Sequence, residues 1–402
     1  MFKILKKILL LTLIAILAIQ VPFIYRRYKI GHLSQAVARI NSERTNREHT
    51  GFKEYKGVLH VHTALGGHST GGFDELIAAA SANELDFAVM TEHYSDQYDT
   101  SALTLNGKIG KTLFIGGNEV DANDGGRYLL IPGSAEASSF AKMDSKAFLE
   151  KIHSEGRIAI NNYPDRKRSD NADQDGIEVY SLHINAKKAN PFPAVFDVIW
   201  SFAAYPELTY ATYFRRNDDY LKRYDAVAAS KKQILTAGSD AHSNKGYYLI
   251  ADDEGNKHFG FKIDDYATVF RLVRMHVLLE SGTPLTRESM IDALRKGNAF
   301  VGFDALGDTG GFSFSADNGP EKRIMGDEIA LANGVKLAAS APNMARFVLF
   351  KDGQKMQEFS GGSEFNVNIS ERGVYRVEAY LDQLGSPFDQ APWIMSNPIY
   401  IR

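Results

Sequence analysis

The sequence of 402 residues contains no cysteine. This absence excludes disulfide bonds and thiolate ligands, so any metal ion must be held by histidine, aspartate or glutamate. The lack of cysteine is also compatible with an extracytoplasmic location. Charge of one sign is not in excess, because the formal net charge is −3, and nothing indicates nucleic acid as a partner. The chain is long enough for one large and one smaller domain, each with its own core.

One long apolar run is present, and it stands at the N-terminus. Between Ile8 and Tyr25 the run is interrupted only by a threonine, a glutamine and a proline, and about 18 apolar residues are near the minimum that crosses a bilayer. The small-residue site of a cleaved signal peptide is poorly matched. Residues 1–30 are therefore predicted to be a single-pass membrane anchor, with a buried or interfacial helix as the alternative. Basic residues flank both ends, so the orientation stays open, with a periplasmic (extracytoplasmic) body favoured.

Beyond a polar linker, residues 31–54, strand-like apolar runs alternate with helix-like stretches over residues 55–304. Such alternation indicates an α/β fold with βα units and a parallel sheet. Six or more units in about 250 residues suggest a distorted (β/α) barrel, which carries its chemistry at the carboxyl ends of its strands. Strands are predicted at 58–62, 87–91, 113–117, 157–161, 176–180 and 233–237, with helices that include 74–85 and 145–155.

From about residue 305 to residue 402 the pattern changes to short runs of alternating apolar and polar residues. Turn signals such as Lys351-Asp-Gly353 and Gly361-Gly362 separate these runs. The pattern predicts a small antiparallel β-sandwich. No constellation of charged residues in it suggests chemistry, so we expect it to serve packing or presentation.

Side chains that bind metals follow several of the predicted strands. His60 and His62 end the first strand, and residues two apart on a strand point to the same side, so a metal ion can bridge them. Asp240 and His242 have the same spacing. Histidine and carboxylate ligands at the mouth of a barrel suit Zn, Mn or Fe. His68, His93 and Glu119 are further candidate ligands, whereas His153 and His276 are predicted to be structural and His183 has no paired partner.

Taken in order, these segments resemble the polymerase and histidinol phosphatase (PHP) superfamily. The resemblance covers about residues 55–245. Residues 284–304 and the terminal "WIMSNPIYIR" are similar to the branch that contains carbaryl hydrolase-like proteins and stand-alone metal-dependent phosphoesterases. The motifs are H-V-H at 60–62, His68 before "STGG", T-E-H at 91–93, G-N-E at 117–119, N-Y-P at 162–164 and G-S-D-A-H at 238–242.

The resemblance implies a distorted seven-stranded (β/α) barrel with two or three divalent metal ions. One ion would be held by His60, His62, Glu119 and Asp240, and a second by His68, His93 and His242. The ligands of a third ion would include the histidine of an N-H-P motif, but Tyr163 stands at that position here. Tyr163, Asn162 or His183 is then a substitute ligand, or the centre is dinuclear. Glu92 stands where aspartate is usual and is given no ligand role.

The reaction that this centre predicts is hydrolysis of a small phosphate monoester or diester by a metal-bound hydroxide. No G-x-S-x-G motif offers a serine nucleophile instead. A metal-bound water, His242 or Tyr163 would protonate the leaving group. Arg166 and Arg168 are candidate phosphate ligands, although a basic run is also typical of a solvated surface.

Two other functions stay open. The same centre would cleave a carboxylic ester or carbamate if its pocket were apolar, lined by the aromatic-rich segment Phe192–Phe214, which is otherwise plain helical core. In the third hypothesis the chain is a non-catalytic, membrane-tethered binding module, because the N-H-P histidine is missing. The retention of seven metal-type residues in register argues against that hypothesis.

Overall fold

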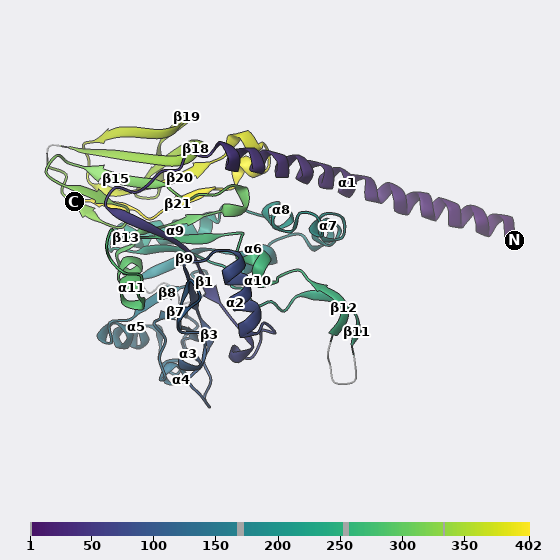
Figure 1. The fold of residues 1–402 in the computed structure, drawn as a ribbon, viewed down its shortest axis with the longest axis horizontal. Coiled ribbons are helices and arrows are strands. Elements are labelled where there is room, and N and C mark those ends of the chain that lie inside the picture. The colour runs from purple at the N-terminus through teal and green to yellow at the C-terminus, as the bar shows by residue number, and fades with distance from the viewer. Residues whose placement is uncertain (1, 167–172, 252–256, 333) are drawn as a thin grey trace.

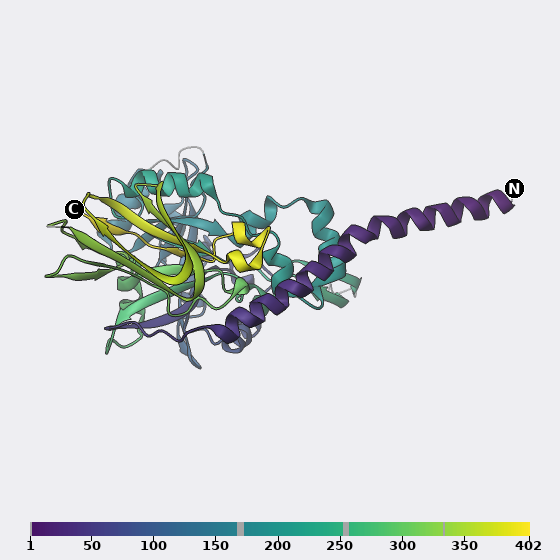
Figure 2. The same ribbon diagram turned by 90° about the horizontal axis from the view of Figure 1, so that it is seen from above.

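The computed structural model describes residues 2–166, 173–251, 257–332 and 334–402. Figure 1 shows a mixed α/β body from which one long helix projects, with the N-terminus at the free end of that helix. The C-terminal strands lie at the other end of the body, and Figure 2 shows the same arrangement from above. The fold is therefore α/β, as predicted, with an apolar helix at the N-terminus.

The projecting helix, α1 (Phe2–Glu43), runs without a break through most of the predicted linker. Its first part is exposed, whereas Phe23, Ile30, Leu33 and Ile40 are buried. These residues recur at helical spacing, so they form an apolar stripe that packs on the body. The linker prediction was wrong up to Glu43, because this stripe continues the helix. An 18-residue window of α1 has a mean hydropathy of 2.5, so the helix is long and apolar enough to cross a membrane, a property that signal sequences share.

The strands predicted between residues 55 and 304 all form, in two sheets that meet. In the larger sheet β1 (Phe52–Val61) lies between β13 (Arg274–Glu280), which is antiparallel to it, and β2 (Phe87–Met90), which is parallel. The next strand is β5 (Thr112–Ile115). The smaller sheet has the order β10-β9-β8-β7-β6-β3, with β10 (Ile234–Gly238), β9 (Gly176–Ser181), β8 (Ile158–Asn161), β7 (Arg127–Ile131), β6 (Asn118–Asp121) and β3 (Glu92–His93).

The two sheets are linked at both edges. Along the chain, β2 leads into β3 and β5 leads into β6, and the bridge between Val61 and Ala241 joins the end of β1 to the residues after β10. The strand β7 is antiparallel to both of its neighbours, so this part of the sheet is not the purely parallel one that βα units predict. The carboxyl ends of β1, β3 and β10 and the first residues of β6 nevertheless come together.

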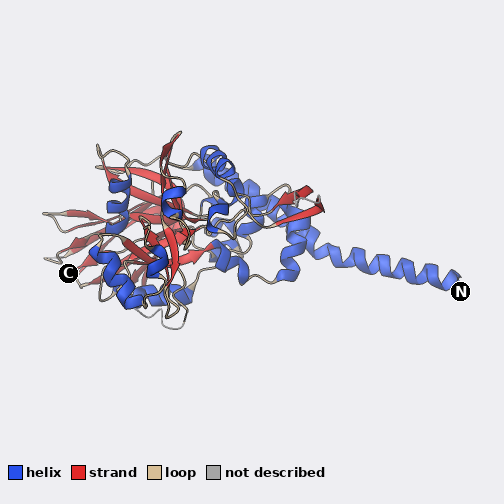
Figure 3. Ribbon diagram, turned by 90° about the horizontal axis from the view of Figure 1, so that it is seen from below, coloured by secondary structure: helices blue, strands red, loops and turns tan. Residues whose placement is uncertain are grey.

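Helices surround these strands (Figure 3). The helix α5 (Ser145–Ser154) begins where the Asp144 carboxylate accepts from the amide of Ala147, and Gly156 follows it with φ 67°, the left-handed conformation that favours glycine. Four helical elements follow β9 and lie near α1 or the site: α6 (Leu182–Lys187), α7 (Pro191–Asp197), the wide π-helical turn η2 (Val198–Phe202) and α8 (Pro206–Ala211). The other longer helices are α2 (Phe73–Ala82), α9 (Asp218–Ala228) and α11 (Arg287–Lys296).

The C-terminal region is a largely antiparallel set of strands. The long pair β18 (Val335–Lys351) and β19 (Gln354–Ile369) is connected at the predicted turn, where Asp352 and Gly353 both have positive φ, as tight hairpins require. Gly361 and Gly362 lie inside β19 and do not end it. The strand β14 (Ala299–Gly302) pairs with both β13 and β21 (Ile394–Ser396), so the C-terminal strands, which also include β15 (Ser313–Asp317), β20 (Gly373–Tyr380) and β22 (Ile399–Ile401), continue the sheet of β1.

Candidate metal centre

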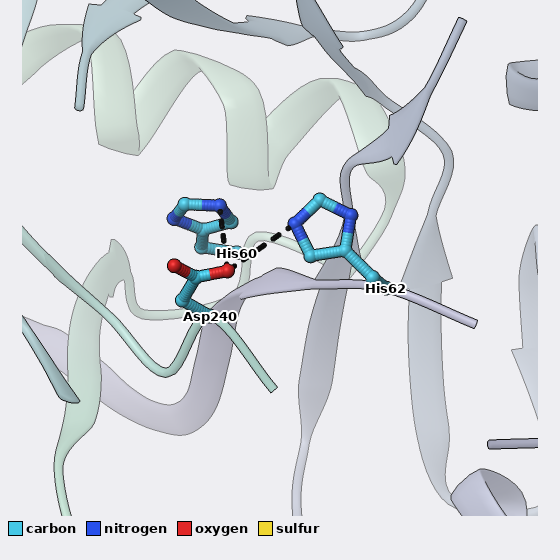
Figure 4. A group of neighbouring side chains, drawn as sticks. All are labelled: His60, His62 and Asp240. Atoms are coloured by element: carbon cyan, nitrogen blue, oxygen red, sulfur yellow. Dashed lines mark ion pairs between the residues drawn. The ribbon is translucent and has the colours of Figure 1, made fainter. Parts of the chain in front are cut away.

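Four of the predicted ligands converge near the carboxyl ends of β1 and β10 and the start of β6. His60 Nε2 lies 3.4 Å from Asp240 Oδ1 and 3.7 Å from Glu119 Oε1. His62 Nε2 lies 3.5 Å from Asp240 Oδ1 and 3.6 Å from Glu119 Oε2. Ligands about 2.1 Å from a tetrahedral ion are separated by about 3.4 Å. His60, His62 and Asp240 thus form a group that could hold a metal ion (Figure 4), and Glu119 lies next to it.

The backbone brings His60 into this cluster in an unexpected way. The register between β1 and β2 shifts between Leu59 and Val61, and His60 has φ 68°. The strand is therefore irregular at His60, and the prediction that the two side chains share one side because they are two residues apart on a regular strand gave the wrong reason. Both imidazoles nevertheless reach the cluster. Histidine enters the left-handed region more readily than most residues, and the bulge re-aims its ring.

The loop after β10 is joined to the end of β1 by backbone hydrogen bonds. The amide of Ser239 donates to the carbonyl of Leu59 over 2.9 Å, and the amide of His62 donates to the carbonyl of Ala241 over 3.0 Å. Asp240, between them, has φ 47°. This pairing holds the Asp240 carboxylate against the two imidazoles, so the ligands are positioned by backbone contacts rather than by flexible side chains.

The electrostatics of the cluster suit a cation. Burial lowers the pKa of His62 to about 3 and that of His93 to about 4, so both rings are neutral and can offer a lone pair at neutral pH. Burial alone would raise the pKa of Glu119, but the neighbouring imidazoles outweigh it and keep the carboxyl ionised. The Nε2 atoms of His60 and His62 are buried and make no hydrogen bond. Buried polar atoms usually have a partner, and a divalent ion would satisfy these.

Glu178, on β9, is a residue of the site that the sequence analysis did not single out. Its Oε2 lies 2.9 Å from His60 Nδ1, and both side chains are fully buried. A carboxylate that binds the distal nitrogen of an imidazole fixes its tautomer and aims the other nitrogen at a metal. Glu178 is thus a positioning partner for His60. Its occurrence as a charged residue within the strand predicted at 176–180 was the only sequence signal.

The second predicted set, His68, His93 and His242, lies on the solvent side of the first. The Nε2 atoms of His68 and His242 are 2.6 Å apart, a distance at which one ring donates to the other. The His93 ring lies 4.2 Å from that of His68 between centroids, and His93 Nε2 is 3.0 Å from Glu119 Oε2. His62, His93 and Glu119 also form a group that could hold a metal ion. Glu119 therefore lies between the two sets.

The tyrosine that replaces the expected histidine is held between two cations. Arg127 and Arg166 lie over the Tyr163 ring, with centroid distances of 5.1 and 4.7 Å. Both guanidinium groups pair with Asp121. Arg127, which sequence analysis did not single out, also lies 3.4 Å from Glu119 Oε1. It is on β7, the strand that was not predicted. Arg168 lies outside the described residues.

Of the other candidate residues, some lie beside the cluster and others lie away from it. Asn162 donates to Glu119 Oε1 over 2.5 Å, and the His183 ring is 5.8 Å from that of His242. Glu92 accepts from the amide and hydroxyl of Thr63, a structural contact. His153, which pairs with Asp175, and His276, which contacts Glu54 on β1, take part in ion pairs away from the cluster.

A cavity of about 700 Å³ opens beside the cluster. Its inner end carries His68, His93, Glu119, Asp240 and His242. Tyr163 and Arg127 also border it. Farther out its walls are mostly apolar and aromatic, and include Leu182, Val198, Phe202, Tyr210, Tyr213 and Phe214. The segment Phe192–Phe214 thus forms a wall of the cavity, so the site combines a charged end with an apolar end.

Comparison with known proteins adds little to this description. No family model matches the chain, and no curated protein matches it. Among solved structures, the chain is similar to PsfC from Pseudomonas syringae PB-5123, with 12% sequence identity and a TM-score of 0.39 over 63% of this chain and 94% of that one. At these values the likeness carries no weight for fold or function.

Proposed function

We propose that this chain is a metal-dependent hydrolase of the PHP type that cleaves phosphate esters. The observation that carries the proposal is the buried cluster of His60, His62, Glu119 and Asp240, whose nitrogen and oxygen atoms lie 3.4–3.7 Å apart. This spacing suits His60, His62 and Asp240 as ligands of one divalent ion, and we propose that Glu119 completes the set. The three histidines on its solvent side and the shared Glu119 support a second ion of the same class, Zn, Mn or Fe.

The strand pairings support the barrel that the sequence motifs imply. The strands β1, β2 and β5 pair in that order in one sheet, and β3, β6, β7, β8, β9 and β10 pair in that order in the other. The chain itself leads from β2 to β3 and from β5 to β6, and the bridge between Val61 and Ala241 returns from the end of β10 to β1. We propose that this circuit is a distorted (β/α)7 barrel, with β7 as its antiparallel member. The cluster then occupies the end at which barrels of this kind carry out chemistry.

Ions bound at the cluster would activate a water molecule and neutralise charge on the phosphoryl group. The protein's own side chains contribute the rest. The Arg127 guanidinium, 3.4 Å from Glu119 Oε1 at the cavity wall, is placed to bind a phosphoryl oxygen. Burial and the nearby carboxylates raise the pKa of Tyr163, so its hydroxyl carries a proton at neutral pH and can give it to the leaving group.

His242 is less suited to donate that proton. Burial lowers its pKa, and its Nε2 contacts His68 while its Nδ1 lies 2.8 Å from the Asp240 carbonyl oxygen. These contacts are typical of a neutral metal ligand whose second nitrogen is oriented by a backbone carbonyl. Arg166 pairs with Asp121, and we assign it a supporting role behind Tyr163.

The apolar outer wall of the cavity favours one second candidate function. A carboxylic ester or carbamate carries no charge that needs Arg127, and the aromatic side chains from Phe202 to Phe214 would bind its apolar groups. A tethered binding module without catalysis is the third hypothesis. It does not explain why imidazoles and carboxylates converge at these distances in a buried site.

One experiment separates these functions. The full chain in detergent is depleted of metal, reloaded with Zn, Mn or Fe, and assayed with nitrophenyl phosphate, bis-nitrophenyl phosphate and nitrophenyl acetate. Turnover of either phosphate ester with two or more ions per chain is the expected result. Turnover of the acetate alone would replace the proposal by the ester and carbamate function. Absence of bound metal and of turnover would leave the non-catalytic module.

A further inference from the structure

The segment formed by α7 and η2 lines the cavity beside the candidate metal centre, and it also exposes apolar side chains next to α1. The helix α7 and the turn η2 that continues it expose Phe192 (61%), Val195 (43%) and Ile199 (65%). Their spacing of three and four residues places them on one face. Val198 and Phe202 of the same segment line the cavity. One thin wall therefore separates the cavity from an exposed apolar face.

This segment is attached to α1. The Phe23 ring stacks on Phe196 with a centroid distance of 4.3 Å, and the Arg26 Nε donates to the buried Asp197 carboxylate over 2.7 Å. Figures 1 and 2 both show α7 beside α1, on the side of the body from which the helix projects. The exposed face of α7 and η2 is thus continuous with the exposed apolar surface of α1.

The length of α1 sets the level of this face relative to a bilayer. A helical run of about 18 residues, from Ile8 to Tyr25, is about 27 Å long, close to the ~30 Å hydrocarbon core. Phe23 is in the last turn of that run, so its stacking partner on α7 lies at the edge of the core. Trp200 of η2 donates to Gln20 Oε1 over 3.0 Å, and tryptophan is enriched at membrane interfaces.

Basic side chains lie at the same level. A second cavity of about 280 Å³, next to α1, is lined by Arg26, Lys29, Lys188 and Arg215, and no acidic side chain is among the described residues that line it. It shares Asn185, Ala189 and Tyr213 with the cavity of the metal cluster. Basic groups next to a membrane helix attract anionic lipid headgroups.

We propose that Phe192, Val195 and Ile199 insert into the membrane interface beside α1, and that the cavity receives a phosphate ester of a lipid from the bilayer. The apolar outer walls hold the acyl portion, and the charged inner end holds the phosphate. The membrane contact stands on geometry alone, whereas the lipid substrate rests on the proposed phosphoesterase function. The experiment below therefore measures the two separately.

The membrane contact is measured by tryptophan fluorescence. The chain has two tryptophans, and Trp393 is fully buried, so quenching by lipid reports Trp200. In vesicles of phosphatidylcholine brominated on the acyl chain near the headgroup, we expect the full chain to be quenched and the W200F variant not to be. Equal fluorescence of the full chain in brominated and ordinary vesicles would overturn the proposal.

The substrate is tested with the triple variant F192S/V195S/I199S in vesicles. We expect hydrolysis of vesicle-borne phosphatidate to fall by about 10-fold, because removing exposed apolar side chains weakens interfacial binding. Hydrolysis of soluble nitrophenyl phosphate should stay within about twofold, since none of the three residues lines the cavity. The matched control is M344S/M356S, which changes two exposed apolar residues of β18 and β19. This variant should hydrolyse both substrates at the wild-type rate.

Each remaining outcome is decisive. An equal loss on both substrates would mean that the three side chains serve stability, and it would overturn the proposed lipid entry. Hydrolysis of nitrophenyl phosphate without hydrolysis of phosphatidate would overturn the lipid substrate while leaving the phosphoesterase in place. Quenching of Trp200 without turnover of any ester would refute the phosphoesterase function and its lipid substrate, and would still support the membrane contact.

Discussion

His60 Nδ1 lies 2.9 Å from Glu178 Oε2, and both side chains are completely buried. The opposite nitrogen of the same ring, Nε2, points toward Glu119 and Asp240. Burial raises the pKa of Glu178 to about 7, so the protonated and ionised forms of this carboxyl are both populated near neutral pH. The pair therefore links a candidate metal ligand to a buried group that holds its ring in place.

The first prediction concerns this pair. E178Q keeps the shape of the side chain but removes its charge, so His60 becomes a weaker ligand. Loss of such a partner lowers metal affinity by about 10–100-fold, and we expect a change of that size in a competition titration with a chelator. E54Q is the matched control, because Glu54 is also hydrogen-bonded to a buried histidine, His276, on β13. Equal metal affinity in E178Q and the wild type would contradict the positioning role.

The second prediction concerns the ligands themselves. H60A and D240N should each lose the tightly bound metal and reduce ester hydrolysis by at least about 100-fold, because both remove a ligand of the four-member cluster. Bound metal is measured by elemental analysis after gel filtration, with circular dichroism as the check on folding. H153A, which changes a half-exposed histidine paired with Asp175, should retain both metal and activity. Full activity in metal-depleted H60A would refute the mechanism.

The third prediction concerns Gly238, the last residue of β10. A Cβ atom there would lie 2.0 Å from Glu178 Oε2 and 2.8 Å from His60 Cβ. G238A must displace this pair, at a cost of about 1–3 kcal/mol, and we expect both a lower unfolding free energy and weaker metal binding. In G72A the new Cβ would meet nothing within 4 Å, so this variant should behave as wild type. Denaturant titration with and without chelator measures both effects.

The fourth prediction is the pH dependence of stability away from the metal. His276 is buried between Glu54 and Asp304; burial would lower its pKa, but these carboxylates raise it to about 9. Because the pKa of His276 is higher in the folded state than in the unfolded state, protonation stabilises the folded state. This contribution is complete at a pH below the unfolded pKa of about 6.5, and it is lost as the pH rises through 9. The shift corresponds to about 3 kcal/mol at most. Urea unfolding should show a decline between pH 7 and 10 that is smaller in H276N.

A wild-type unfolding free energy that stays constant over this pH range would contradict the fourth prediction. The comparison of the wild type with H276N separates His276 from other groups that titrate in the same range, since those groups are present in both proteins. E54Q provides an independent control. It removes one carboxylate that holds the His276 proton, so the decline should begin at a lower pH.

The fold could be predicted well where local signals are strong. The apolar runs that became β1, β2, β5, β8, β9 and β10 are bounded by polar residues or glycine, and the helix α5 has a capping aspartate and a terminal glycine. The strands β3 and β6 were not predicted, because β3 has only two residues and β6 is mostly polar, so neither shows an apolar run. The strand β7 was also missed, although its apolar run is as long as those of the predicted strands. The helical continuation of α1 to Glu43 was missed because its apolar stripe is stabilised by packing on the body.

The sequence by itself determined which residues could bind a metal: without cysteine, only the histidines and carboxylates that follow its strands were available, and their order already indicated a shared site. Only the tertiary structure decided how they meet. The bulge at His60, the pairing of the loop at Asp240 with the end of β1, and the placement of Glu178 and Arg127 all arise from contacts between residues far apart in the chain. Local propensity does not encode such contacts, because they depend on how the sheets close on each other.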